Sequence, residues 1–88
     1  MTYQTIAMVL PEIEKNTEAV EISYWLKKDG DLIQKDEAIC EVATEEFEFE
    51  LNATDSGILK IIAKNGTMIK NGETVCEILC EVVENEQE

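Results

Sequence analysis

The sequence of 88 residues contains no histidine, one proline and only 7 basic residues against 20 acidic ones. Without histidine, and with no C-x-x-C spacing among Cys40, Cys76 and Cys80, it lacks the usual ligand set of a zinc site. The formal net charge of -13 argues against nucleic acid and anionic membrane surfaces, because phosphate binding needs clustered Lys and Arg. We therefore expect no metal, no nucleic acid and no membrane, and a protein partner with a basic surface.

Long apolar runs are also missing. No stretch approaches the roughly 18 residues of a membrane span, and the N-terminus has no basic region followed by an apolar one. These absences predict neither a span nor a signal peptide, and a cytoplasmic location. The length predicts one small domain over residues 1–82, followed by an acidic, mobile tail over residues 83–88 that has almost no apolar side chain.

The three cysteines each share a strand parity with apolar neighbours. Cys40 is expected on the same strand face as Val42, and Cys76 and Cys80 on the same face as Ile78. This pattern favours small core residues kept as free thiols over a redox or nucleophilic role.

The stretch from Ile39 to Leu51 predicts a hairpin. Apolar residues recur at every second position on both sides of an acidic pair, Glu45 and Glu46. The expected buried faces are Ala38, Cys40 and Val42 on one strand, and Phe47, Phe49 and Leu51 on the other. The opposite parity holds Glu41, Glu48 and Glu50, so we expect one side of the hairpin in water and two glutamates at its tip.

Shorter β patterns flank the hairpin. Alternation predicts a strand over Thr2 to Leu10, a second over Val20 to Leu26 and a short third at Leu32-Ile33. In the second strand Val20, Ile22 and Tyr24 share one parity, and Trp25 is expected to cover a sheet face from outside or to close one end of the core. Residues 11–19 are polar and predict a loop.

An internal repeat decides the architecture. At an offset of 36 residues Lys28 matches Lys64, Gly30 matches Gly66 and Cys40 matches Cys76, and no gap interrupts the register. Each copy has too little apolar surface to stand alone, so the two copies are expected to bury each other around a pseudo-two-fold axis. The predicted fold is all-β, a flattened antiparallel barrel or sandwich of about eight short strands.

Three motifs resemble those of lipoyl and biotinyl carrier domains. In chain order they are W-L-x-K-x-G-D from Trp25, E-V-x-T from Glu41 and S-G at Ser56-Gly57. The resemblance is strongest to the lipoyl domains of dihydrolipoyl acyltransferases and covers nearly the whole domain. It implies a barrel-sandwich hybrid in which a lysine at a hairpin tip carries lipoic acid or biotin in amide linkage.

The resemblance also implies where the attachment lysine should be. Thr44 falls on the family threonine, Glu45 on the acidic residue and Glu46 on the lysine. A carboxylate cannot form the amide that an amine forms, so we expect no cofactor. The nearest lysines, Lys35 and Lys60, lie outside the expected tip. The predicted interaction site is Thr44, Glu45, Glu46, Phe47 and Glu48.

Three functions are compatible with this pattern. The first is a monomeric, non-acylated interaction module related to 2-oxo acid dehydrogenase complexes, which docks on a lipoate ligase or a dehydrogenase subunit. The second is a biotin or lipoyl carrier domain of an acyltransferase whose attachment lysine is substituted or lies elsewhere. The third is a structural domain like those of membrane-fusion adaptors, although this chain lacks their long helical hairpin.

Two further roles for the glutamates are less compatible with the sequence. Glu45 and Glu46 at an exposed tip should both be ionised, which does not favour catalysis by an acid and a base, and we expect no enzyme. The outer row of glutamates could bind calcium weakly, but strands spread these side chains instead of wrapping them around one ion. A solvated acidic face is the favoured interpretation.

Overall fold

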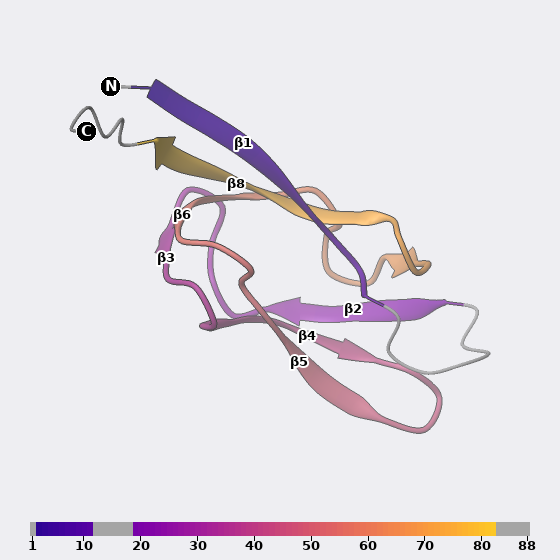
Figure 1. Cartoon of the computed structure of the whole chain (residues 1–88). Coiled ribbons are helices and arrows are strands. Elements are labelled where there is room, and N and C mark those ends of the chain that lie inside the picture. Colours follow the sequence, from indigo (N-terminus) through magenta and orange to yellow (C-terminus); the bar gives the residue numbers. More distant parts are fainter. Residues whose placement is uncertain (1, 12–18, 83–88) are drawn as a thin grey trace.

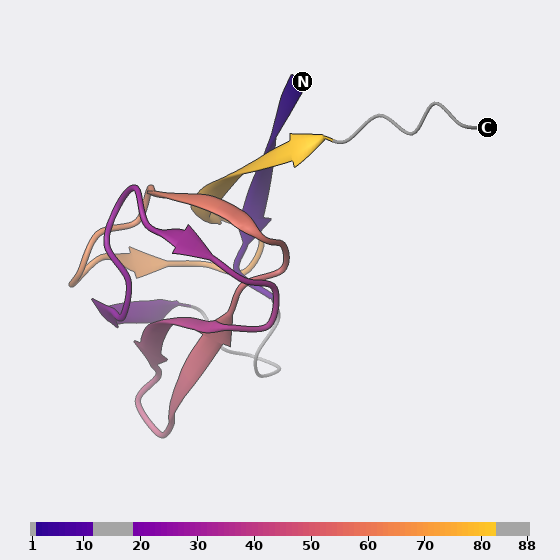
Figure 2. The same ribbon diagram turned by 90° about the vertical axis from the view of Figure 1, so that its left-hand side faces the viewer.

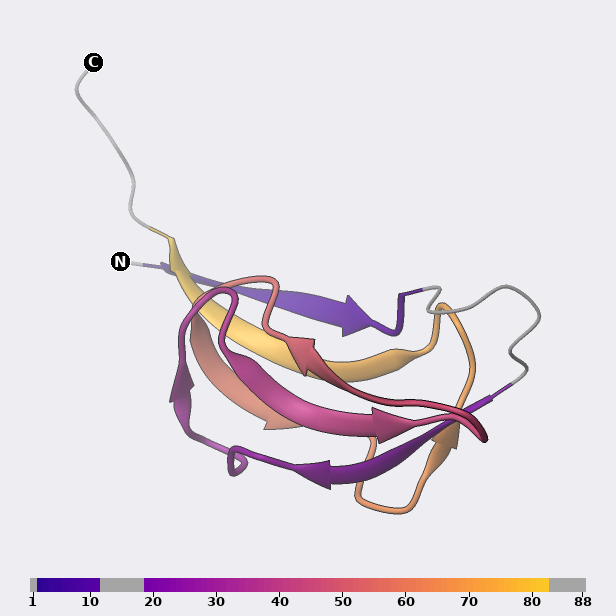
Figure 3. The same ribbon diagram turned by 90° about the horizontal axis from the view of Figure 1, so that it is seen from below.

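The computed structural model describes residues 2–11 and 19–82, and it places eight strands there in two four-stranded antiparallel sheets. Sheet A has the order β1-β8-β6-β3 and sheet B the order β5-β4-β2-β7. The sheets lie face to face in Figure 1, and Figure 3 shows them from below. No helix in the described ranges is long and apolar enough to cross a membrane. The strands are β1 (Thr2–Val9), β2 (Val20–Trp25), β3 (Leu32–Ile33), β4 (Ala38–Ala43), β5 (Glu48–Asn52), β6 (Gly57–Ile61), β7 (Met68–Ile69) and β8 (Thr74–Val82).

The repeat predicted from the sequence is present as two matching units. The first unit is β2, β3 and β4, and the second is β6, β7 and β8. Within each unit the long strands pair with each other, but the two-residue strand pairs across, β3 with β6 and β7 with β2. Each sheet therefore contains strands from both copies, and the all-β sandwich with pseudo-two-fold symmetry is confirmed.

Matching turns connect the strands of the two units. Gly30 and Gly66 occupy equivalent positions with φ of 95° and 85°, a left-handed conformation that glycine adopts without a Cβ clash. The next turn has Asp36 at a φ of 73° in the first unit and Gly72 at 88° in the second. Aspartate tolerates this conformation better than most residues, so the two copies keep one backbone path with different side chains.

The core lies between the sheets and takes apolar residues from both units. Cys40 and Cys76 are fully buried at equivalent positions, and both are free thiols, as the sequence predicted. Cys80 is also free but only half-buried, because it lies toward the end of β8. The other buried residues are Met8, Leu10, Val20, Ile22, Ile33, Ile39, Val42, Leu51, Ala53, Leu59, Ala63, Ile69, Val75 and Ile78.

Two irregularities overturn parts of the predicted strand faces. The register of β2 against β4 shifts between Ile22 and Tyr24, which turns Tyr24 outward and leaves it 46% exposed. A second shift, between Ala38 and Cys40, leaves Ala38 only half-buried and buries Ile39 instead. An extra residue on one strand of a pair interrupts the two-residue alternation on which the prediction relied.

Trp25 closes an edge of the core. Its side chain is half-buried and packs against the core cluster, and its indole Nε1 donates a hydrogen bond of 2.7 Å to the carbonyl of Ala63. One of the two positions expected for this tryptophan is therefore correct. Strand β2 ends at this residue and β1 ends at Val9, one residue earlier than predicted in both cases. The predicted loop over 11–19 and the predicted tail over 83–88 fall wholly or almost wholly outside the described residues.

Gly57 has a close neighbour that a larger residue would not tolerate. A Cβ here would overlap the backbone oxygen of Leu79 and lie 2.9 Å from Ile78 Cγ2. We expect Gly57→Ala to lower the free energy of unfolding by about 1–3 kcal/mol, because the obstacle is backbone and cannot rotate away. Urea denaturation measures the change. Thr67→Ala, at an exposed position, is the control and should stay within about 0.5 kcal/mol of the unchanged chain; equal losses in both variants would contradict the packing argument.

The buried thiols predict a loss of stability in alkali. Burial raises the pKa of Cys40 from 9.0 to about 12 and that of Cys76 to about 11. The unfolded chain releases these protons near pH 9 and the folded chain retains them, so their contribution is complete below pH 9 and falls as the pH rises toward 11. The urea midpoint should fall over this range. It should fall less steeply in a Cys40→Ala, Cys76→Ala double variant, and parallel profiles would exclude the thiols as the cause.

Candidate functional site

The tip of the hairpin between β4 and β5 is held by Thr44. Its backbone N–H donates a hydrogen bond of 2.8 Å to the carbonyl of Phe47, which closes the turn. Its side-chain Oγ1 accepts hydrogen bonds from the N–H groups of Glu46, at 3.1 Å, and Phe47, at 3.0 Å. A threonine hydroxyl that accepts from the next residues is a common way to stabilise a turn. The tip therefore has a defined backbone shape.

The remaining tip residues project into solvent. Glu45, Glu46 and Glu48 are exposed, and Thr44 is half-buried. Phe47 was predicted on the buried face of the second strand, but it is 51% exposed. The prediction was wrong because the N–H and C=O of Phe47 belong to the turn and β5 begins only at Glu48. The tip thus presents an aromatic ring among three carboxylates.

The hairpin tip lies at the end of the molecule away from the start of β1 and the end of β8. The views in Figures 1 and 2 agree on this arrangement. A partner that contacts the tip therefore meets a surface well separated from the outer part of the β1–β8 ladder.

One face of sheet B continues the negative charge of the tip. The acidic face, as we call it, is the outer side of sheet B and contains Glu21, Glu41, Glu48 and Glu50. Glu41 and Glu50 lie directly opposite each other on neighbouring strands. Like charges in this position destabilise a sheet, so the pair gains from any cation that approaches it.

The negative charge of the acidic face changes the pKa of Tyr24. Its hydroxyl donates a hydrogen bond of 3.3 Å to Glu41 Oε2. The negative charge of Glu41 and this hydrogen bond, with smaller effects of burial and of Glu50 and Glu48, raise the pKa of Tyr24 above its ordinary value of 10.0. Tyr24 and Glu41 are thus joined across neighbouring strands of the acidic face.

The chemistry available at the tip is limited. No lysine occurs among residues 44–48, and within the described ranges no three His, Cys, Asp or Glu side chains form a group that could hold a metal ion. Lys35 lies in the turn before β4, at the opposite end of that strand from the tip. Lys60 is exposed on β6, opposite Glu77 in sheet A. Neither lysine reaches the hairpin tip.

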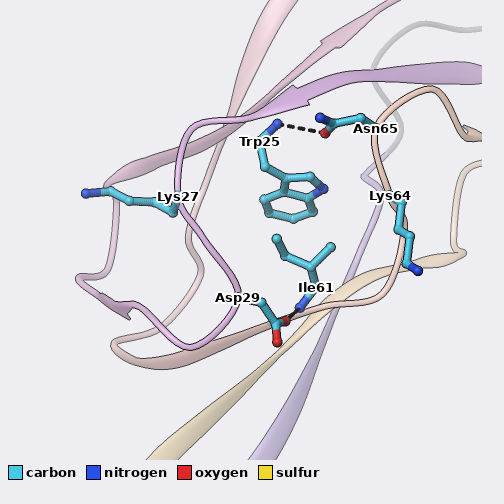
Figure 4. Close-up of a pocket in the computed structure, with 6 residues that line it drawn as sticks. All are labelled: Trp25, Lys27, Asp29, Ile61, Lys64 and Asn65. Atoms are coloured by element: carbon cyan, nitrogen blue, oxygen red, sulfur yellow. Dashed lines mark hydrogen bonds between the residues drawn. The ribbon is translucent and has the colours of Figure 1, made fainter.

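A shallow pocket of about 650 Å³ lies where the two repeat units meet. Asn65 Oδ1 accepts a hydrogen bond from the N–H of Trp25 at 3.0 Å, and at the equivalent position Asp29 Oδ1 accepts one from Ile61 at 2.6 Å (Figure 4). The lysine Lys27 on its rim forms an ion pair of 2.6 Å with Glu37. The two hydrogen bonds join the two units, whereas the ion pair lies within the first unit, so the polar groups of the pocket already have partners in the fold.

Sequence reasoning located the tip but missed part of the acidic face. The residues Thr44 to Glu48 were predicted and are contiguous, and Glu41 and Glu50 are on the expected outer side. The contribution of Glu21 was not foreseen. Glu21 lies on β2, and the alternation of this strand already places it on the outer side. The alternation within one strand does not predict, however, which distant strand lies beside β2.

Comparisons with known proteins agree with the fold and the motifs. The model of the Biotin_lipoyl family, described as biotin-requiring enzyme, matches residues 6–78. The solution structure of the lipoyl domain of the 2-oxoglutarate dehydrogenase complex from Azotobacter vinelandii superposes with a TM-score of 0.68 and 25% identity, over 86% of this chain and 96% of that one. The resemblance inferred from the motifs is therefore confirmed.

Curated relatives point to the same group of complexes. The acetyltransferase component of the acetoin cleaving system of Bacillus subtilis is 33% identical over 54 residues, which are 61% of this chain and 14% of that protein. The mitochondrial pyruvate dehydrogenase protein X component of Mus musculus is 32% identical over 54 residues, 61% of this chain and 11% of that protein. The chain thus matches only a small part of these relatives.

The hydroxyl of Thr44 predicts a measurable change at the tip. In Thr44→Val the N–H groups of Glu46 and Phe47 lose their acceptor, and we expect their hydrogen exchange to accelerate about tenfold, which corresponds to about 1.4 kcal/mol. The free energy of global unfolding should change by less than about 1 kcal/mol, because the tip is exposed. Thr44→Ser keeps the hydroxyl and is the control. Unchanged exchange rates in the valine variant would show that the hydroxyl does not hold the tip.

Proposed function

The chain belongs to the Biotin_lipoyl family, and from that membership we propose that it is a non-acylated interaction module related to 2-oxo acid dehydrogenase complexes. It docks by the hairpin tip and the acidic face on a protein with a basic surface. In this proposal it is not itself an enzyme, carries no lipoate or biotin, and acts in the cytoplasm. The observation that carries the proposal is the exposed glutamate Glu46 at the hairpin tip, the position on which the motif resemblance places the attachment lysine.

The donor set of the tip does not fit an amide-linked cofactor. Attachment of lipoate or biotin needs an amine on a flexible side chain, and residues 44–48 offer hydroxyl, carboxylate and aromatic groups only. Lys35 and Lys60, the nearest lysines in sequence, lie away from the tip. This placement supports the interaction module over the alternative, a carrier domain acylated on another lysine.

The charge distribution supports a basic partner. The tip contributes Glu45 and Glu46, and the acidic face contributes the opposed pair Glu41 and Glu50. A partner that brings Lys or Arg to this surface relieves the repulsion within the pair and gains steering over a long distance. A dehydrogenase subunit is one candidate partner, because a relative named above is a component of pyruvate dehydrogenase. A lipoate ligase is the other, because the resemblance implies a domain on which such a ligase acts.

Acylation tests the proposal directly. The unchanged chain and a Glu46→Lys variant are each incubated with lipoate ligase, lipoate and ATP, and their intact masses are measured. We expect only the variant to gain one lipoyl group, because the hairpin already has the required shape and lacks the amine alone. Glu45→Lys has the same net charge with the lysine one position away, and it should be acylated far less.

The same mixture tests docking. An excess of the unchanged chain should slow acylation of the Glu46→Lys variant, because both present the same surface to the ligase. A chain carrying Glu41→Gln and Glu50→Gln should compete less. Acylation of the unchanged chain would overturn the proposal and support a carrier with its lysine elsewhere. If the unchanged chain is neither acylated nor able to compete, the attachment site is still lost, and a dehydrogenase subunit becomes the expected partner in place of the ligase.

A further inference from the structure

The four sheet edges of this domain are not equally protected. β3 and β7, at one edge of each sheet, have two residues each, and β5, at the other edge of sheet B, carries Glu48 and Glu50. Short strands and charged side chains both prevent an edge from pairing with another chain. The remaining edge is β1, which has eight residues.

Strand β1 lacks all of these protections. Its residues, Thr2–Val9, include no charged side chain and no proline, although 31% of the chain is charged. They are rich in β-branched and aromatic residues, which favour strand pairing. One edge of β1 pairs with β8, and no strand of the described residues pairs with the other edge. Its N–H and C=O groups on that side are available to a further strand.

The outer half of β1 lies beyond the core. Thr2–Gln4 and Cys80–Val82 pair only with each other, because β6 reaches no further along β8 than Leu79. Figure 2 shows this two-stranded ribbon projecting from the sandwich. A two-stranded ribbon is marginally stable in water by itself, so added strands would stabilise it. These residues also lie outside the segment that matches the family, residues 6–78.

We propose that β1 pairs antiparallel with β1 of a second copy of this chain, which joins two A sheets into one continuous sheet. An uncharged strand meets its own copy without any like-charge pair, whereas the other long edge strand, β5 of sheet B, carries Glu48 and Glu50. Such a contact is self-complementary and closes as a two-fold dimer. The monomer expected from the sequence took no account of this edge.

The apolar side chains beside β1 fit the same contact. Leu32, Ile58 and Leu79 form a row across the outer face of sheet A, at mutually paired positions, and are all exposed. Thr5 continues the row onto β1, and Tyr3 lies two residues beyond it. In a dimer with its axis perpendicular to the sheet, the rows of both copies form one apolar band. The two acidic faces lie on other sheets and stay apart.

The net charge of -13 on each copy opposes this association over a long range. Salt shortens the screening length from about 30 Å at 0.01 M to about 3 Å at 1 M, and the paired edge has no ion pair to lose. The dimer should therefore tighten as salt increases. Docking by the acidic face should weaken under the same change, so the two contacts respond to salt in opposite directions.

Sedimentation equilibrium on the full chain, in 0.05 M and 0.5 M NaCl, tests the dimer. We expect a dimer whose dissociation constant falls in the higher salt. The apolar rows of the two copies meet end to end only when the two-fold axis passes close to Thr5, the last residue of each row. Thr5→Glu then brings two carboxylates together and should raise this constant about tenfold or more. Thr67→Glu makes the same change at an exposed position outside sheet A and should leave the constant within about twofold of the unchanged chain.

A charge swap removes the possibility that Thr5→Glu only disturbs folding. Thr5→Lys should weaken self-association in the same way, and an equal mixture of Thr5→Glu and Thr5→Lys should form a mixed dimer at least as tight as that of the unchanged chain. A chain that stays monomeric at both salt concentrations would overturn the proposal. So would a dimer that Thr5→Glu and Thr67→Glu weaken equally, because the contact would then lie elsewhere.

Discussion

Cross-pairing of the two repeat units is the constraint on which this structure depends. Each unit supplies two long strands to one sheet and a two-residue strand to the other, β3 to β6 and β7 to β2. Neither sheet is complete without the other unit, and the buried residues come from both. The hydrogen bonds from Trp25 to Asn65 and from Ile61 to Asp29 repeat the same exchange in side chains. The hairpin that carries the tip is anchored in this shared core through the buried side chains of Val42 and Leu51.

The architecture was predictable from the sequence because the residues that repeat are ones that form turns or fill the core. Gly30 and Gly66 have positive φ at equivalent turns, and Cys40 and Cys76 fill equivalent core positions. The errors arise where tertiary pairing changes the alternation. The shift after Ile22 turned Tyr24 outward, and the turn at Thr44 took Phe47 out of the strand. The first change is not marked in the local composition, since a bulge depends on how two separate segments pair. The second is local, because the Thr44 hydroxyl and backbone hold Phe47 in the turn.

The candidate site was predictable in position and incompletely predictable in extent. A motif aligned with a known family places Glu46 at a hairpin tip, and strand parity places Glu41 and Glu50 outward. Glu21 belongs to the acidic face because β2 pairs with β4, and the alternation within one strand does not predict which strand it pairs with. Electrostatic effects across strands, such as the raised pKa of Tyr24, are visible only once these strands are side by side.

The pseudo-symmetry of the backbone makes the asymmetry of the surface informative. Equivalent strands β4 and β8 carry different neighbours at their free sides, the acidic β5 in one sheet and the uncharged β1 in the other. The acidic tip and the uncharged edge lie at opposite ends of the domain, which is the arrangement that the proposed docking and the proposed dimer require. Since tip and edge lie at opposite ends, a dimer through β1 would carry two docking tips and could engage two basic sites at once, with the gain in apparent affinity that linked sites provide.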